Sequence, residues 1–345
     1  MSRSLKVVHV GCGSISKSWF NAAVNRPDVV IAGIVDLNLE TARARQAEFK
    51  LDQAQTGTDL KAMLKAVKPD VVFDCTVPGA HKSVTLAALK AGCHVLGEKP
   101  LADSLASARA MCRAAQKSGR IYAVMQNRRF TPQIRAFRKL IADGELGDLT
   151  TLYSDFFIGA HFGGFRDRME HVLLLDMAIH TFDAARFLTG AEPVAVYCKE
   201  WNPKGSWYDH DASAITIFEM SNGIIYSYRG SWCAEGLRTT WESGWRAIGT
   251  KGSATWDGAK GIQAQAVTGS EGFAYPLKDV AAPPFEAMAS EGHAGFIHDG
   301  LDCLQQGRIP QTVCTDNIKS LAMVFAAIKS AKTGKRVLIK TGLEK

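Results

Sequence analysis

Short apolar runs alternate with amphipathic stretches along the first 125 residues. Residues 6–10 have the length of a buried strand, a glycine-rich turn follows at residues 11–16, and the next ten residues have helical spacing. A second apolar run, residues 29–35, ends at Asp36. Buried strands that alternate with helices are typical of a parallel sheet with helices on both faces. The pattern therefore predicts an α/β fold at the N-terminus.

The same alternation continues to about residue 125 and predicts a doubly wound parallel sheet. The loops at residues 76–81 and 98–100 each follow a predicted strand, and ligands bind at the carboxyl edge of such sheets. Further strands are predicted at residues 70–75, 94–97 and 121–125, and helices at residues 39–49, from a Thr58–Asp59 cap to before Lys68, at residues 80–91, and from an Asp103 cap to Ser118.

The pattern changes after residue 125, where alternating apolar and polar positions joined by short turns predict an antiparallel meander. The fold class is thus an α/β domain, residues 1–125, plus an α+β domain with a large, mostly antiparallel sheet, residues 126–345. The stretch 258–284 is rich in Gly, Ala and Pro and is predicted to be loosely structured. Strands are predicted at residues 149–158, 194–199, 214–220, 224–232, 245–248, 252–256 and 337–340, and helices at residues 132–141, 172–188, 287–305 and 316–332.

Composition excludes few classes of protein. The net charge of +7 is modest and the basic residues are scattered, which argues only weakly for nucleic acid, so no nucleic-acid partner is expected; a small anionic ligand could use the charge too. No run of about 18 apolar residues and no signal peptide is evident, so a membrane partner is not expected. The eight cysteines lie far apart without metal-ligand spacing, so the sequence predicts a cytoplasmic protein and no metal site.

The strand, glycine turn, helix, strand and acid of residues 6–36 follow the order of a dinucleotide-binding Rossmann unit. Gly11 lets the chain turn sharply, and Gly13 leaves room for a pyrophosphate at a helix N-terminus. Asp36 is placed to bind the adenine ribose hydroxyls and would repel a 2′-phosphate, so NAD is favoured over NADP. The third motif position is Ser16 rather than Gly or Ala. The alternative is a tight structural turn that binds no ligand.

An apolar segment at residues 173–183 carries Asp176, His180 and Asp183, which share one face of an α-helix. Histidine transfers protons near neutral pH, and a carboxylate one turn away can orient it. A satisfied structural His–Asp pair is the alternative. Lys99 follows a predicted strand at the cofactor edge and could bind a substrate hydroxyl or form a surface salt bridge, while Glu98 could contact a ligand or cap a helix.

The sequence resembles the Gfo/Idh/MocA family of sugar and inositol dehydrogenases over roughly residues 5–190. The most specific similarity is the block from Thr76 to Pro100, which resembles TPxxxH…AGxHVxxEKP, although Pro78 falls one place late. Residues 174–183 resemble the family's DxGxHxxD helix, with Ala178 in place of Gly. Glu170-His171-Val172 replaces a glycine-rich lead-in. The stretches 129–132 and 144–147 resemble the family's interdomain segment.

The resemblance implies the catalytic group Lys99, Asp176 and His180. His180 would take the proton of the reacting hydroxyl, Lys99 would hold that oxygen, and Asp176 would bind a neighbouring hydroxyl or orient the site. The family often has a cis peptide before the proline of EKP, here Pro100. The implied cofactor is NAD, bound by Gly11, Gly13, Ser14, Ile15, Asp36, Thr76, Pro78, His81, Glu98, Lys99 and Asn127.

The loop 159–171 and its neighbours are predicted to line the substrate side. Its arginines could bind a carboxylate or several hydroxyls, or the loop could simply be solvated. Six of the seven tryptophans lie between residues 201 and 256, where they could stack on sugar rings but more often cover a sheet or an oligomer contact. The predicted substrate-binding residues are Lys99, Asn127, Arg128, His161, Arg166, Asp176 and His180.

These expectations describe an NAD-dependent dehydrogenase of a sugar, inositol or polyol, assembled as a homodimer or homotetramer through its large sheet. A glycoside hydrolase that uses NAD for transient oxidation is a second candidate with the same fold. A dinucleotide-sensing protein without catalysis is a third, although a sensor has no need of Lys99, Asp176 and His180.

Overall fold

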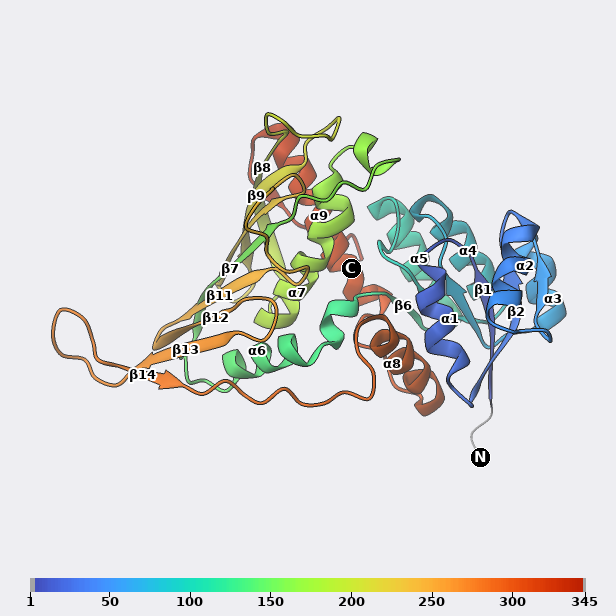
Figure 1. The fold of residues 1–345 in the computed structure, drawn as a ribbon, viewed down its shortest axis with the longest axis horizontal. Coiled ribbons are helices and arrows are strands. Elements are labelled where there is room, and N and C mark those ends of the chain that lie inside the picture. The colour runs from blue at the N-terminus through green and yellow to red at the C-terminus, as the bar shows by residue number, and fades with distance from the viewer. Residues whose placement is uncertain (1–3, 344–345) are drawn as a thin grey trace. The chain divides into compact units, whose positions relative to one another are not determined.

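A six-stranded parallel sheet and its helices make up the N-terminal part of the computed structural model, which describes residues 4–343 (Figure 1). The strand order is β3-β2-β1-β4-β5-β6, so the chain winds outward in both directions from β1. The strands are β1 (Leu5–Val10), β2 (Val29–Val35), β3 (Gln55–Gly57), β4 (Val71–Asp74), β5 (His94–Gly97) and β6 (Tyr122–Val124). The helices are α1 (Ser16–Val24), α2 (Leu39–Glu48), α3 (Leu60–Val67), α4 (Pro78–Lys90), α5 (Leu105–Ser118) and the 3₁₀ helix η1 (Asn127–Phe130).

Aromatic side chains fill the core on the α1 side of this sheet. Trp19 on α1 is fully buried and meets the rings of Phe73 on β4 and Phe296 on α8 (Gly292–Gln306). Helix α8 thus packs beside α1 although it lies far along the chain (Figure 1). Burial of these large rings is the main favourable contribution to holding α8 on the sheet.

A nine-stranded sheet forms the second part of the fold, in the order β14-β13-β12-β11-β7-β10-β9-β8-β15. Every neighbouring pair is antiparallel except β7 and β10, which run parallel. The strands are β7 (Leu149–Phe157), β8 (Pro193–Trp201), β9 (Ser213–Met220), β10 (Ile225–Ser231), β11 (Gly244–Gly249), β12 (Gly252–Trp256), β13 (Ile262–Val267), β14 (Leu277–Val280) and β15 (Val337–Leu338).

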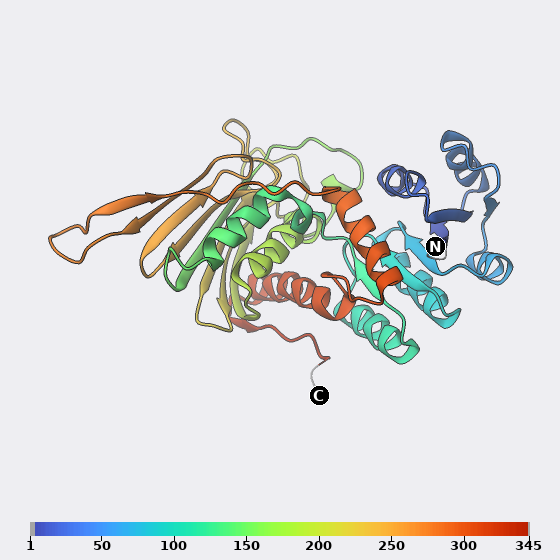
Figure 2. The same ribbon diagram turned by 90° about the horizontal axis from the view of Figure 1, so that it is seen from below.

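Helices α6 (Pro132–Ala142), α7 (Ile179–Thr189) and α9 (Cys314–Thr333) form a layer on one face of this sheet (Figure 2). Along β8, β9 and β10 buried residues alternate with more exposed ones, as a sheet with a single covered face requires. Phe182 on α7 packs between Phe218 and Tyr228 on the covered face. The opposite face of the sheet is left without a helix layer.

The chain is divided into two compact units. Unit 1 comprises the residues up to Phe130, Ala289–Ile318 and the residues from Thr341, and unit 2 comprises Thr131–Met288 and Lys319–Lys340. The chain therefore passes between the units more than once, and α9 belongs to both. Compactness does not measure independent folding, so the predicted domain boundary between residues 125 and 126 stays a prediction.

The predicted fold class is confirmed, and three local expectations were wrong. Residues 258–284 contain β13 and β14 rather than a loose segment, because Ala264 and Ala266 turn into the covered face while Gln263 and Gln265 stay in water. Ser104, not Asp103, caps α5 by accepting the amide of Ser107. The helix expected over residues 287–305 begins at Gly292. The helix expected over residues 172–188 is present.

That helix is not α-helical throughout. Residues Leu173–Ala178 form a π-helix, η3, and α7 begins only at Ile179. A π turn holds more residues than an α turn, so the spacing of side chains around the helix axis changes between Asp176 and His180. Such an insertion carries no periodic signal in a single sequence, and π turns are frequent at functional sites.

Candidate active site

The glycine turn between β1 and α1 has the geometry of an anion site. Gly11 has φ +89°, and a Cβ added there would lie 2.6 Å from the carbonyl oxygen of Cys75. A Cβ at Gly13 would meet nothing within 4 Å, so this position borders open space. The backbone N–H groups of Ser14 and Ile15 have no hydrogen-bond acceptor among residues 4–343 and lie at the N-terminus of α1. These features fit the diphosphate of NAD.

Asp36 fastens the end of β2 to the glycine turn. Its Oδ2 accepts the amide of Cys12 at 2.8 Å, and its Oδ1 accepts the amide of Asn38 at 2.9 Å. The carboxylate is half-buried, which is where a carboxylate that binds ribose hydroxyls is expected. Burial raises the pKa of the Cys12 thiol to about 12, so no thiolate charge opposes a phosphate at this turn.

Ser16 and Arg45 explain the departure from the usual glycine motif. The Ser16 hydroxyl donates to the carbonyl of Gly13 at 2.6 Å. Arg45 on α2 donates its Nε to Ser16 Oγ at 3.2 Å and its Nη2 to Gly13 O at 3.3 Å. Because both contacts are to the turn itself, Arg45 braces it and adds a positive charge beside it. Sequence reasoning missed Arg45, since nothing in the sequence of α2 distinguishes it from Arg43, the other arginine of that helix.

The loop after β4 is organised by a buried carboxylate. Asp74 is fully buried and accepts the hydroxyl of Thr76 at 2.6 Å through Oδ1 and His81 Nδ1 at 3.1 Å through Oδ2. The His81 Nδ1 therefore carries the proton, and the buried Nε2 has no hydrogen-bond partner within residues 4–343. Pro78 opens α4 and is exposed. The structure thus orients two predicted cofactor residues through Asp74, which the sequence analysis did not single out.

Glu98 connects the end of β5 to α1. Its Oε1 accepts the indole N–H of the buried Trp19 at 2.7 Å, and its Oε2 accepts the amide of Lys99 at 3.2 Å. The carboxylate is therefore a structural acceptor in unit 1 rather than a helix cap. Lys99 itself is half-buried, and its peptide bond to Pro100 is cis, as the resemblance implies.

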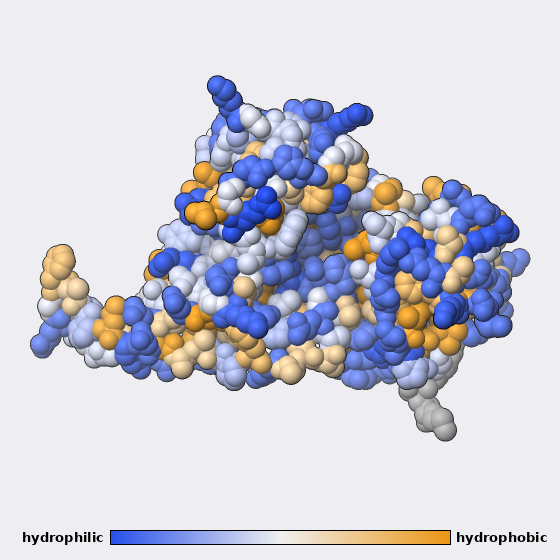
Figure 3. All heavy atoms as spheres, in the orientation of Figure 1, coloured by the Kyte–Doolittle hydropathy of each residue, from blue (hydrophilic) through white to orange (hydrophobic). Residues whose placement is uncertain are grey.

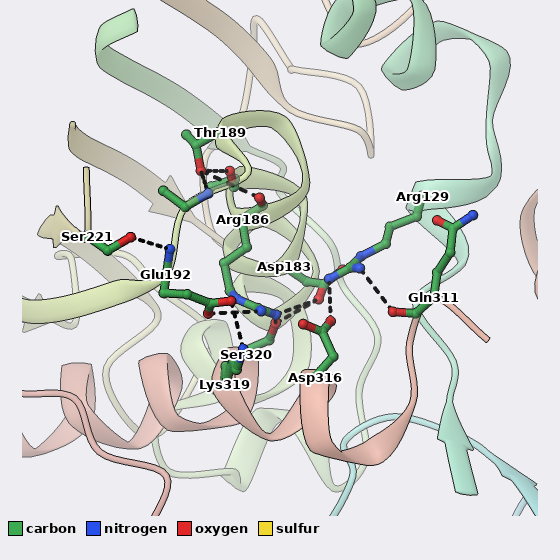
Figure 4. Close-up of polar contacts among 12 residues, drawn as sticks. Arg129, Asp183, Arg186, Thr189, Glu192, Ser221, Gln311, Asp316, Lys319 and Ser320 are labelled. Atoms are coloured by element: carbon green, nitrogen blue, oxygen red, sulfur yellow. Dashed lines mark hydrogen bonds and ion pairs between the residues drawn. The ribbon is translucent and has the colours of Figure 1, made fainter. Parts of the chain in front are cut away.

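The carboxyl end of β6 carries polar atoms that the described chain leaves unsatisfied. Both side-chain polar atoms of the buried Gln126 and the Oδ1 of Asn127 lack hydrogen-bond partners within residues 4–343. Buried amides of this kind need a partner, and a bound dinucleotide would supply one. Arg129, by contrast, is engaged with the carbonyl of Gln311 and the carboxylate of Asp316 (Figure 4). Arg128 is buried in the same 3₁₀ helix.

Asp176 and His180 lie in unit 2, on either side of the change from η3 to α7, whereas Lys99 lies in unit 1. Arg166 donates its Nε to Oδ2 of Asp176 at 2.8 Å. The predicted substrate residues Arg166 and Asp176 are therefore brought together. His180 is half-buried in the first turn of α7.

Asp183, the last acid of the predicted polar stripe, is part of a buried network instead (Figure 4). Its Oδ1 accepts the hydroxyl of Ser320 on α9 at 2.7 Å, and Arg186 donates to the same hydroxyl at 2.9 Å. Arg186 also pairs with Glu192, which in turn pairs with Lys319. Asp183 thereby anchors α7 to α9, so its role is structural.

The loop before η3 is held by aromatic rings and ion pairs. His161 pairs with Glu235 at 2.8 Å and stacks on Trp207 at 3.7 Å between ring centroids. Of the six tryptophans between residues 201 and 256, Trp232, Trp245 and Trp256 are core residues of the sheet unit, while Trp201, Trp207 and Trp241 keep some exposure.

His171, where the resemblance implies a glycine-rich lead-in, has φ +53°. Its Nδ1 lies 2.7 Å from Oε2 of Glu200, and its carbonyl accepts the amide of Leu175 at the start of η3. Burial raises the pKa of Glu200, although the contact with His171 opposes this rise. The buried pair stabilises a left-handed turn that a non-glycine residue rarely adopts.

Two family sequence models match this chain. The oxidoreductase family with an NAD-binding Rossmann fold, Gfo/Idh/MocA, matches residues 5–126, and the C-terminal domain of the same family matches residues 134–255. Among curated proteins, the D-apiose dehydrogenase of Paraburkholderia graminis is 27% identical over 348 residues, 96% of this chain and 89% of that protein. The inositol 2-dehydrogenase of Corynebacterium glutamicum strain R is 30% identical over 234 residues, 65% of this chain and 66% of that protein.

A solved structure of an oxidoreductase from Agrobacterium radiobacter, in complex with NAD⁺, L-tartaric acid and magnesium, has a TM-score of 0.85 with this chain at 22% identity. The match covers 99% of this chain and 100% of the Agrobacterium radiobacter chain, and the two chains have the same fold. No helix within residues 4–343 could span a membrane.

The two family models together cover more than half of the chain, and relatives over most of its length are named dehydrogenases or reductases. They confirm the predicted family, the class of enzyme and NAD as the cofactor of the Rossmann unit. The chain belongs to the Gfo/Idh/MocA family of NAD-binding oxidoreductases.

Proposed function

We propose that this protein transfers a hydride between a CH–OH group of a sugar, inositol or related polyol and the nicotinamide of NAD. The observation that carries the proposal is that a chain of this NAD-binding family contains Lys99, Asp176 and His180 at the matching motif positions. Relatives named D-apiose dehydrogenase and inositol 2-dehydrogenase support a polyhydroxylated substrate.

Each of the three residues has a chemical role in this proposal. Bound NAD supplies the hydride acceptor at its nicotinamide. His180 accepts the proton of the reacting hydroxyl, because an imidazole nitrogen can both accept and donate a proton. Lys99 donates a hydrogen bond to the same oxygen and stabilises the charge that develops there. Asp176, held by Arg166, accepts a hydrogen bond from a neighbouring hydroxyl.

On the cofactor side, the proposal assigns the adenosine ribose to Asp36 and the diphosphate to the turn of Gly11, Gly13, Ser14 and Ile15. The orphaned amides of Gln126 and Asn127 are proposed to bind polar groups of the cofactor or the substrate. The remaining proposed ligands are Thr76, Pro78, His81, Glu98, Arg128 and His161, each at the position described above.

A substrate screen tests the proposal. Purified protein with NAD, and separately with NADP, is mixed with inositols, aldoses, anhydrosugars, sugar acids and polyols, and reduced nicotinamide is followed by absorbance. The proposal predicts NADH formation with NAD on one stereochemical group of compounds. If no compound reacts although calorimetry shows NAD binding, the dehydrogenase assignment is wrong. Glycoside cleavage without net NADH would then favour the hydrolase, and no reaction of either kind would favour the sensor.

We also propose that the enzyme is a homodimer or homotetramer joined through the open face of the nine-stranded sheet. Tyr153, Tyr197, Ile215, Ile217 and Ile225 are all more than one third exposed on this face. A cavity of about 720 Å³ on the same face is bordered by Tyr153, Arg229 and Arg246. So large an exposed apolar surface is typical of an interface between proteins.

The hairpin that joins β13 to β14 adds to this surface. It reaches beyond the helices of unit 2 and carries a hydrophobic tip (Figure 3). Phe273 and Leu277 there are largely exposed. A second copy of the chain is the occupant that the resemblance implies.

We propose a cytoplasmic location on the evidence of the thiols. All eight cysteines are free, and seven of them are buried. A reducing compartment keeps such thiols free. Fractionation of the native host would test this, and recovery of the protein outside the cytoplasm would contradict it.

A further inference from the structure

Arg166 is held in an unusually fixed position for a side chain that is one third exposed. It lies in the 3₁₀ helix η2 (Arg166–Arg168), and its guanidinium carbon is 4.9 Å from the centroids of both the Phe162 and the Phe165 rings. Its Nε donates to Asp176 at 2.8 Å. Two aromatic contacts and one ion pair therefore restrict a side chain that is otherwise rich in rotamers.

The end of the guanidinium is not used by this arrangement. Neither Nη1 nor Nη2 of Arg166 forms a hydrogen bond or ion pair within residues 4–343, because Asp176 occupies only the Nε position. Both rings beside it are substantially exposed, Phe162 at 45% and Phe165 at 69%. The result is a planar pair of donors at an accessible surface, flanked by apolar walls.

That geometry favours a carboxylate as the ligand. Two parallel N–H donors match the two oxygens of a carboxylate, whereas a single hydroxyl can use only one of them. Apolar rings on either side reduce the contact of the guanidinium with water and so strengthen a charge-assisted hydrogen bond. A side chain that is already fixed also loses little freedom on binding.

We infer that Arg166 binds a carboxylate of the substrate, so that the substrate is a polyhydroxy acid, such as an aldonate or a uronate, rather than a neutral polyol. The inference rests on the proposed function and narrows it to one class of compound. Arg166 is then the residue that determines this specificity, and its contact with Asp176 places the acid group beside the hydroxyl-binding side of the site.

Matched pairs of probes isolate the carboxylate. D-Gluconate and D-glucitol, D-galactonate and galactitol, D-glucuronate and D-glucose, and D-galacturonate and D-galactose each differ mainly at one terminal carbon. Binding to the NAD-loaded protein is measured by calorimetry, and turnover by NADH absorbance. At least one acid is expected to bind about 30-fold more tightly than its neutral partner.

Three variants at two positions of the same short helix complete the test. In Arg166→Met the advantage of the acid over its neutral partner is lost, while Arg166→Lys keeps the charge without the fork and retains part of it. Arg168→Met is the matched control, because Arg168 is exposed with no side-chain partner within residues 4–343, and it should bind as wild type does. In Arg166→Met, the KM for the acid should rise by a larger factor than kcat falls.

The outcomes separate the two claims. Tighter binding of an acid that depends on Arg166 supports the inference whether or not the compound is oxidised, and absence of turnover then counts against the proposed function alone. Oxidation of neutral polyols as efficiently as of the acids would support the function and overturn the inference. Equal binding of acids and neutral partners in all four pairs would also overturn it.

Discussion

Single side chains hold the glycine turn of unit 1 from several directions. His9 donates its Nε2 hydrogen to the carbonyl of Gly11 at 2.9 Å, Asp36 accepts the amide of Cys12, and Arg45 bonds the carbonyl of Gly13. Each contact limits where a diphosphate can lie. Residues far apart in the sequence thus decide the geometry of a turn that a motif describes only by its glycines.

Asp36 should determine the choice of cofactor. Asp36→Ser removes the carboxylate that binds two ribose hydroxyls and repels a 2′-phosphate. We expect KM for NAD to rise about 30-fold while activity with NADP increases. Steady-state assays with both cofactors measure the change. Equal KM values for NAD in the variant and the wild type would remove Asp36 from the cofactor site.

His180 and Lys99 should matter far more for chemistry than for cofactor binding. His180→Ala is expected to lower kcat about 1,000-fold because it removes the proton acceptor. Lys99→Ala is expected to abolish measurable turnover. NAD affinity, measured by calorimetry, should stay within a few-fold of wild type in both variants. Retained turnover would contradict the catalytic assignment.

His9 should make stability depend on pH. Burial lowers the pKa of His9 to about 4, so the folded protein keeps it neutral while the unfolded chain binds a proton below about 6.5. The contribution of neutral His9 to the free energy of unfolding is complete above pH 6.5. It is lost as the pH falls toward 4, and the loss reaches about 3 kcal/mol.

His9→Phe keeps a ring against Phe20, which stacks on His9 at 4.1 Å, and cannot titrate. Urea unfolding is measured for wild type and variant between pH 7.5 and 4.5. The free energy of unfolding should fall less with decreasing pH in the variant than in the wild type. Parallel curves would mean that His9 is not the group responsible.

At the scale of elements, most helices and strands follow from apolar periodicity and caps. Asp59 caps α3 as predicted, and the β8, β9 and β10 strands alternate as their sequences do. What could not be predicted depends on contacts from distant segments. Three features leave no pattern in the local sequence: the π turn of η3, the contact of Asp74 with His81, and the pair of His171 with Glu200. Each depends on residues whose position is fixed elsewhere in the fold.

The same limit applies to the predicted site. Motif positions predict Asp36, Lys99, Asp176 and His180 as site residues, and α-helical spacing also assigned Asp183 to the polar stripe. The structure shows that Asp183 is buried against Ser320 and Arg186. A single sequence could not separate the two acids, since both stand in the same apolar segment.

The network of Asp183 should stabilise unit 2. Asp183→Ala leaves the buried hydroxyl of Ser320 and the charge of Arg186 without this acceptor, and should lower the free energy of unfolding by about 2 kcal/mol. Lys319→Ala, which removes a more exposed ion pair of the same network, should cost less than about 0.5 kcal/mol. Equal losses in urea unfolding would show that burial does not set the strength of this network. NAD affinity should not change in either variant.

At the scale of the whole molecule, we expect unit 1 to bind NAD and the open sheet face of unit 2 to form the interface between subunits. Ile217→Lys places a charge on that face and should convert the oligomer to monomers in light scattering coupled to gel filtration. Ile309→Lys is the control, because Ile309 is 73% exposed in unit 1 and should leave the mass unchanged. A wild-type monomer would refute the assembly.

The most direct test of the central claim is NADH formation on a panel of polyols and sugar acids by wild type and His180→Ala, with NAD binding measured on the same samples. The account predicts that wild type reduces NAD with one group of related compounds and that the variant binds NAD but reduces it about 1,000-fold more slowly. Wild-type protein that binds NAD yet reduces it with no compound, or a variant that reacts as fast as wild type, would contradict the account.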